Sequence, residues 1–264
     1  MENYDLPKLE HHKYPPYGEC IYCGEISDLR IEHIVPFGLS GNLELPDSTC
    51  KNCADITSKI EMTILRGEFW AVRVFRELQS RRKHSSAPKN FPIKIVRNGI
   101  EKEIRLPANE YPILIHFPIF TAPGVLTSAE KNPGVQISGI DTISFGQNPK
   151  DFLLKHKAES ISASASQNPV AFARMIAKIA YSMAAATGAL KLLKSPSPIP
   201  AVILGKETAV GHWVGTINAP NIKHPGMLHR IAVFPDDKLG MLVGDVQLFS
   251  DSYAPRYGVI LGYL

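Results

Sequence analysis

The sequence CIYCGEISDLRIEHIVPFGLSGNLELPDSTCKNCADITSKIE, residues 20–61, contains all four cysteines of this 264-residue chain. They form two pairs with the same spacing, Cys20-x-x-Cys23 and Cys50-x-x-Cys53. Each pair is typical of a tight turn that offers two thiolates, and two such turns brought together make a tetrahedral four-thiolate site, which zinc prefers. We therefore expect a structural zinc ion. Its closed coordination leaves no open position for a substrate.

Between and after the cysteine pairs, the sequence predicts two strands, a turn and a helix. Residues 29–36 are rich in Ile and Val, residues 37–41 contain two glycines, and residues 42–45 form a short second strand. Residues 47–49 turn into the second cysteine pair. A helix is expected over residues 55–82, with Ser58 and Glu61 at the spacing of a capping box and Gly67 as a bend. Its candidate buried positions are Ile56, Ile60, Ile64, Val72, Phe75 and Leu78.

This order of strand, turn, strand and helix resembles the HNH endonucleases. The similar subgroup has C-x-x-C, then E-H-I-x-P, a glycine turn, and C-x-x-C at the start of a helix. The residues that carry the resemblance are the two cysteine pairs and Glu32-His33-Ile34-Val35-Pro36, and it covers only residues 20–61. The resemblance implies a zinc-stapled ββα-metal module over residues 1–84 that hydrolyses DNA phosphodiester bonds.

The resemblance also implies a role for each central residue. His33 would be the general base, and Glu32 would be a ligand for a catalytic Mg²⁺ or another divalent cation. A neutral histidine can take a proton from water, and a divalent cation can offset charge on the phosphate. Adjacent strand residues point to opposite faces, so a distortion or the turn geometry must let both act at one site.

The residue after the last cysteine departs from the family pattern. Family members commonly carry Asn or His there to help hold the metal, whereas Ala54 has no ligand atom. Asp55 either substitutes as a ligand or is a helix-start residue favoured by the helix dipole. Asn42 is either a turn residue or the middle Asn of the family name. The alternative function is therefore a catalytically impaired, zinc-stapled module that binds nucleic acid or protein.

The end of the expected helix is basic, with Arg73, Arg76, Arg81 and Arg82. These side chains either contact a nucleic-acid backbone or form a solvated helix end. A net charge of +4 agrees with an anionic partner, and we expect DNA. The chain has no phosphate-binding glycine loop, no G-x-S-x-G and no H-E-x-x-H, so the sequence gives no support to those enzyme classes.

Residues 85–264 predict an α+β domain with a mostly antiparallel sheet and one long helix, which would position a substrate or a partner. A hairpin is expected over residues 91–106 with Asn98-Gly99 as its turn, followed by strands at 111–120 and 135–145. Asn168 and Pro169 predict the start of a helix that ends near residue 188, with Arg174 and Lys178 on one side, either solvated or contacting phosphate. Strands complete the chain over residues 201–264.

Composition places the chain among soluble proteins, with 44% hydrophobic and 20% charged residues. The first 18 residues lack the apolar core of a signal peptide. The most apolar long segment, residues 169–193, carries Arg174 and Lys178 and predicts a buried helix rather than a membrane span. We expect a cytoplasmic protein, where thiols stay reduced and paired cysteines favour a metal over a disulfide.

Overall fold

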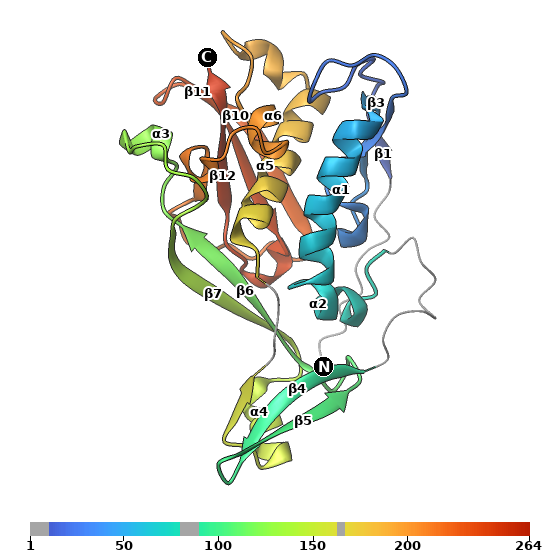
Figure 1. Ribbon diagram of the computed structural model, residues 1–264, viewed down its shortest axis with the longest axis vertical. Helices are drawn as coiled ribbons and strands as arrows, with labels where there is room; N and C mark the ends of the chain where they lie inside the picture. The colour runs from blue at the N-terminus through green and yellow to red at the C-terminus, as the bar shows by residue number, and fades with distance from the viewer. Residues whose placement is uncertain (1–10, 80–89, 163–166) are drawn as a thin grey trace.

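Helix α5 (Pro169–Ala186) lies at the centre of the molecule in this computed structural model, which describes residues 11–79, 90–162 and 167–264. As predicted, Asn168 caps the helix by accepting a hydrogen bond from the Ala171 amide at 2.9 Å, and Pro169 occupies the first turn. Most of its side chains are buried, because α5 contacts both the C-terminal strands and the N-terminal helix α1 (Lys51–Arg66). Figure 1 shows α1 and α5 side by side.

The C-terminal part of the chain forms a four-stranded antiparallel sheet against α5 (Figure 1). Its strands are β9 (Val214–Thr216), β10 (His229–Asp236), β11 (Met241–Leu248) and β12 (Tyr257–Tyr263), in the order β10-β11-β12-β9. Short helical segments connect α5 to the sheet and its strands to one another. They are η3 (Ala189–Leu192), α6 (Ile199–Ile203), η4 (Val210–His212) and η5 (Ser250–Ser252).

The N-terminal part contains the predicted order of strand, turn, strand and helix. Strand β3 (Leu43–Thr49) lies between β1 (His12–Lys13), to which it is parallel, and β2 (Arg30–His33), to which it is antiparallel. The 3-10 turn η1 (Phe37–Leu39) connects β2 to β3, and α1 follows β3 directly. Residues 47–49, predicted as a turn, are therefore the end of a longer strand.

The prediction of one helix over residues 55–82 is wrong in two respects: the helix begins earlier, and it is interrupted. Cys50 is the N-cap of α1, so Ser58 and Glu61 lie inside the helix and form no capping box. Gly67 ends α1, and a separate helix, α2 (Trp70–Phe75), follows after a short break. Ile64, Val72 and Leu78 are buried as predicted, Ile60 and Phe75 are half-buried, and Ile56 is exposed.

A smaller lobe extends below the C-terminal sheet in Figure 1. The predicted hairpin is confirmed as β4 (Phe91–Arg97) and β5 (Ile100–Leu106), with Asn98 and Gly99 at φ values of 50° and 72°. Positive φ angles at both residues of the Asn-Gly pair are typical of a type I′ turn, whose backbone matches the right-handed twist of the two flanking strands. The remaining elements of the lobe and its connection are β6 (Pro112–Phe120), α3 (Gly124–Thr127), β7 (Ile137–Gly146), α4 (Pro149–His156) and β8 (Ser160–Ser162).

Aromatic side chains join the two parts of the chain into one core. The ring of Phe69 lies 5.9 Å from that of Phe117, 6.1 Å from that of Phe172 and 5.3 Å from that of Phe249. Such ring pairs stabilise a core beyond their buried area. Phe69 precedes the domain boundary predicted at residue 84 and its three partners follow it. The two predicted segments thus share a hydrophobic core, and the boundary itself lies outside the described residues.

Candidate metal centre and active site

The four cysteines come together as predicted, at the start of α1. Cys50 caps the helix, Cys53 lies in its first turn, and Cys20 and Cys23 flank the turn that packs beside them. All four sulfur atoms lie within 4.8 Å of one another, and the sulfurs of Cys23 and Cys50 are 3.7 Å apart. Zinc–sulfur bonds of ~2.3 Å in a tetrahedron place neighbouring sulfurs ~3.8 Å apart. The cluster can therefore hold a metal ion, and its dimensions suit zinc.

Helix α5 holds the first cysteine turn in place. The Tyr181 hydroxyl donates a hydrogen bond of 2.8 Å to the Ile21 carbonyl, and the hydroxyls of Tyr22 and Ser182 are 3.1 Å apart. The rings of Tyr22 and Tyr181 stack with their centroids 6.0 Å apart. The part of the chain that the sequence assigned to a separate domain is therefore one wall of the metal centre.

Lys178 of α5 is buried against the N-terminal unit, with 2% of its surface exposed. Its Nζ lies 2.5 Å from Oε1 of Glu32 and 2.9 Å from Oε1 of Glu61. It also donates hydrogen bonds to the His33 carbonyl and, at 3.3 Å, to the Ile34 carbonyl. The predicted solvated or phosphate-contacting Lys178 is thus wrong, because the buried carboxylate of Glu32 needs a counterion that only a buried cation can supply.

The pKa values of Glu32 and Lys178 are both raised, for different reasons. Burial raises the pKa of Glu32, and the neighbouring Glu61 raises it further, against the opposing effect of Lys178. Burial alone would lower the pKa of Lys178, but the carboxylates of Glu32 and Glu61 outweigh it and raise that pKa. Two carboxylates around one ammonium therefore favour the charged form of Lys178.

His33 ends β2 and points away from this cluster, as alternation along a strand requires. Its side chain is 19% exposed, and it pairs directly across the sheet with Glu44 of β3. Its Nδ1 lies 3.8 Å from Oε1 of Glu44, and Nδ1 of His11 lies 3.9 Å from the same oxygen. Sequence reasoning missed Glu44, although an acidic residue on the strand expected to pair with that of His33 could have suggested it.

A close backbone approach shapes the turn behind His33. A Cβ atom on Gly41 would lie 2.0 Å from the Val35 carbonyl oxygen, so no other residue fits there without moving the chain. Arg73 braces the same turn, since its Nε donates a hydrogen bond of 2.6 Å to the Gly38 carbonyl and its Nη1 donates one of 3.0 Å to the Leu65 carbonyl. The position of His33 at the rim is therefore fixed by turn, strand and helix together.

The residues predicted to hold Mg²⁺ do not fit a divalent ion. Glu32 is bonded to Lys178, Ala54 offers no ligand atom, and Asp55 is exposed on α1. Within residues 11–79, 90–162 and 167–264, the four cysteines are the only group of three or more His, Cys, Asp and Glu side chains close enough to hold a metal. The ammonium of Lys178 fills the position beside Glu32 that a divalent cation was expected to take.

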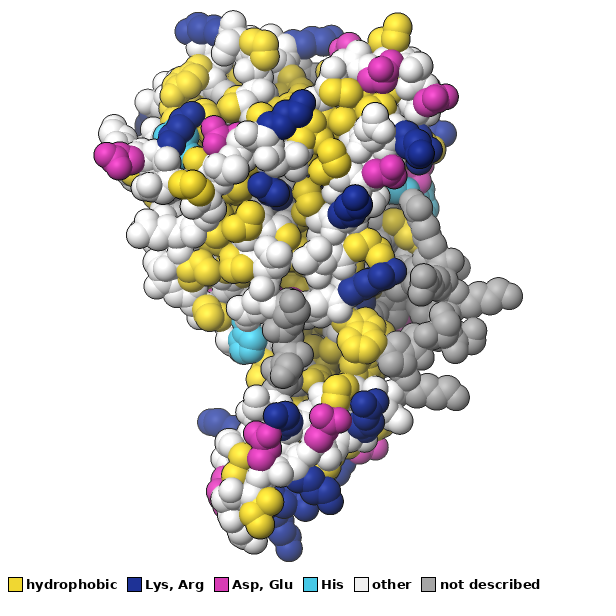
Figure 2. Space-filling view, in the orientation of Figure 1, with side chains coloured by type: hydrophobic (Ala, Val, Ile, Leu, Met, Phe, Trp, Pro, Cys, Tyr) yellow, Lys and Arg dark blue, Asp and Glu magenta, His cyan; other side chains and the backbone are white. Residues whose placement is uncertain are grey.

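Two arginines of the predicted basic cluster are engaged inside the fold. Arg76 is buried and forms a two-pronged ion pair with Asp251, with 3.1 Å between Nη1 and Oδ1, and Arg73 is engaged with backbone carbonyls. Both therefore act inside the fold, and the expectation that they contact phosphate is corrected. Arg81 and Arg82 lie outside the described residues. On the face drawn in Figure 2, Lys and Arg side chains are widely spread and Asp and Glu side chains lie beside several of them.

Comparison with protein-family models, curated proteins and solved structures finds no match for this chain. None of the helices in the described part of the chain combines the length and apolar character that a membrane span requires.

Proposed function

We propose that the zinc-stapled unit of β2, η1, β3 and α1 is an HNH-type nuclease centre that hydrolyses DNA phosphodiester bonds, with His33 as the general base. The observation that supports this most directly is the pairing of His33 with Glu44 at the rim of the unit, 3.8 Å apart, where the imidazole is partly exposed. An imidazole beside a carboxylate is a common arrangement for a general base, because the negative charge stabilises the imidazolium that forms.

Each residue near His33 then has a defined task. The imidazole takes a proton from the attacking water, and Glu44 stabilises the resulting positive charge. Lys178 does not touch the substrate, since it is buried, but it holds the His33 carbonyl and so fixes the end of β2. A divalent ion would supply charge neutralisation at the phosphate. We assign no step to such an ion, because Glu32 is committed to Lys178.

Plasmid cleavage by pure, zinc-loaded protein tests the proposal. Supercoiled DNA would be incubated with Mg²⁺, Mn²⁺ or a chelator that leaves the zinc in place, using the wild type and His33→Ala. The exposed His12 lies on β1, which β3 separates from β2, and it provides the matched control variant His12→Ala. We expect nicking by the wild type and by His12→Ala, and a loss of ~10²–10⁴-fold in His33→Ala. Equal cleavage by His33→Ala would refute the general-base role.

A second candidate is favoured by one specific observation, the ion pair between Lys178 and Glu32. In that case the unit binds nucleic acid or protein without cleaving it, and the lysine preserves the fold where a catalytic metal was lost. Fluorescence anisotropy with labelled DNA and RNA duplexes and single strands, measured at several salt concentrations, distinguishes this function. Salt-dependent binding by a protein that leaves every substrate intact would support it.

A further inference from the structure

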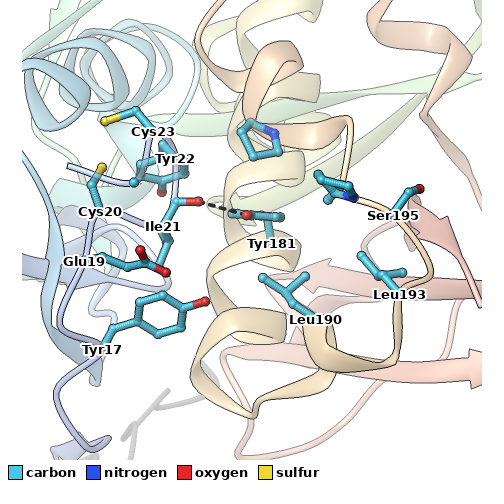
Figure 3. Close-up of a pocket in the computed structure, with 14 residues that line it drawn as sticks. Tyr17, Glu19, Cys20, Ile21, Tyr22, Cys23, Tyr181, Leu190, Leu193 and Ser195 are labelled. Carbon is cyan, nitrogen blue, oxygen red and sulfur yellow. Dashed lines mark hydrogen bonds between the residues drawn. The ribbon is translucent and has the colours of Figure 1, made fainter. Parts of the chain in front are cut away.

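A cavity of about 390 Å³ opens between the first cysteine turn and the segment that follows α5. Figure 3 shows Tyr17 and Glu19 on one side, Leu190, Leu193 and Ser195 on the other, and Tyr181 between them. Cys20 and Cys23 also line it, so the metal centre forms part of its wall. The volume is in the range of pockets that bind small ligands or single side chains. The proposed nuclease function makes no use of this cavity.

Its lining is negative and aromatic. Glu19 supplies a carboxylate. A zinc ion held by the four thiolates would add a net charge of about −2. No Lys, Arg or His is among the lining residues in the described part of the chain. Tyr17, Tyr22 and Tyr181 line the cavity together with leucines and prolines. This combination repels phosphate and favours a cation that has an apolar stem.

We propose that this cavity binds the guanidinium group of an arginine side chain presented by a partner polypeptide. A guanidinium is planar and weakly hydrated, so it can stack on a tyrosine ring while it donates paired hydrogen bonds to the carboxylate of Glu19. An ammonium gives up more hydration and lacks the planar surface. Free arginine is disfavoured, because its own carboxylate would lie close to Glu19 and the thiolates. A polypeptide is therefore the source of the side chain.

NMR titration of the zinc-loaded full chain tests this inference. The probe is N-acetyl-L-arginine amide, compared with N-acetyl-L-citrulline amide, which has the same shape without the charge, and with free arginine. We expect saturable shifts at Tyr17, Tyr181 and Leu190 with a Kd on the order of millimolar for the arginine amide, because one side chain buries little surface. Citrulline amide should give no saturation. Equal binding of the two amides would overturn the proposal, and tighter binding of free arginine would overturn the polypeptide source.

Two variants separate the site from non-specific attraction. Glu19→Gln and Tyr17→Leu each change an exposed lining residue, while Glu130→Gln removes an exposed carboxylate that does not line the cavity. We expect an affinity about 3- to 10-fold weaker for each lining variant, as for the loss of one charged or cation–π contact, and no change for Glu130→Gln. Unchanged binding by Glu19→Gln would refute the site. Cleavage activity is not a readout here, so this result and that of the nuclease assay are independent.

Discussion

Nζ of Lys178, on the central helix, lies 2.5 Å from Oε1 of Glu32, on the second strand of the N-terminal unit. Glu61 and two backbone carbonyls complete the surroundings of the ammonium. Four oxygen atoms around one buried cation resemble the environment that a hard metal ion would have. The pair therefore joins the two halves of the chain and removes Glu32 from the surface at which a substrate phosphate would bind.

Replacing Lys178 with methionine should destabilise the protein by ~3–5 kcal/mol at pH 7, because the carboxylate of Glu32 is left buried without a counterion. The loss should be smaller at pH 5. The pKa of Glu32 is already raised by burial, and without Lys178 it rises further, so the carboxyl takes up a proton as the pH falls. Urea unfolding of zinc-loaded protein at the two pH values measures both effects.

The double variant Lys178→Met/Glu32→Gln is the control for this prediction. It removes both charges, so it should recover part of the stability that Lys178→Met loses, and the cycle gives the coupling between the two residues. If the single and double variants were equally unstable, the ion pair would not be the cause of the loss.

Removing one thiolate should also destabilise the protein. Cys53→Ser should lower stability by several kcal/mol, since the binding of structural zinc is part of the folding free energy. The exposed Ser58 on the same helix gives a matched control, Ser58→Ala, which should melt within a few degrees of the wild type. Thermal melting with zinc analysis is the measurement, and one zinc per chain is expected. An unchanged melting temperature in Cys53→Ser would exclude a structural metal.

Local patterns predicted several features of the structure correctly. The cysteine spacing predicted a four-sulfur cluster, Asn98-Gly99 predicted the hairpin of β4 and β5, and Asn168-Pro169 predicted the start of α5. Each of these features depends either on residues close together in sequence or on a set of side chains that has few uses other than one kind of site. Zinc ligands belong to the second kind, because four reduced cysteines in two equal pairs have few other uses.

Long-range pairing could not be predicted in this way. Lys178 has the helical spacing of a surface residue, and only the folded structure brings Glu32 and Glu61 to it. The same applies to Arg76, whose partner Asp251 lies near the C-terminus. The apparent capping box failed for a local reason, since Cys50 already caps α1 and Glu61 faces Lys178. Charged residues whose partners lie far away in the sequence were therefore the main source of wrong expectations.

The pairing of His33 with Glu44 leads to a prediction about the proposed cleavage reaction. Glu44→Gln keeps the size of the side chain and removes its charge, so the imidazolium loses its stabilising partner. We expect cleavage to slow by about threefold to fivefold, the value of one partly exposed charge pair. Single-turnover rates on a nicked-plasmid assay measure this, with the exposed Glu77→Gln as the control. If Glu44→Gln cut at the wild-type rate, Glu44 would have no part in the reaction.

We expect the stability of the fold to depend on pH through His229. Its Nε2 lies 2.8 Å from the Leu39 carbonyl, so Nε2 carries the proton, and its Nδ1 accepts a hydrogen bond of 3.2 Å from the Phe249 amide. A protonated ring could not accept the second bond. Burial, the largest cause, lowers the pKa of His229 from 6.5 to about 4. The imidazole is therefore held neutral between the turn behind His33 and the C-terminal sheet.

Stability from this group should be present above pH 6.5 and should be lost as the pH falls towards 4, because the unfolded chain binds a proton that the folded chain excludes. The loss should reach at most about 3 kcal/mol, at 1.36 kcal/mol for each unit of pKa difference. Other groups titrate in the same range, so the test is a difference between proteins. In urea unfolding, His229→Gln should have a lower free energy of unfolding than the wild type at pH 7, and the difference should shrink by pH 4.5. For the exposed His12→Gln, the difference from the wild type should stay constant with pH. A constant gap between His229→Gln and the wild type across this range would mean that His229 takes up its proton at the same pH in the folded and unfolded chains, and the neutral, hydrogen-bonded state of its ring would be refuted.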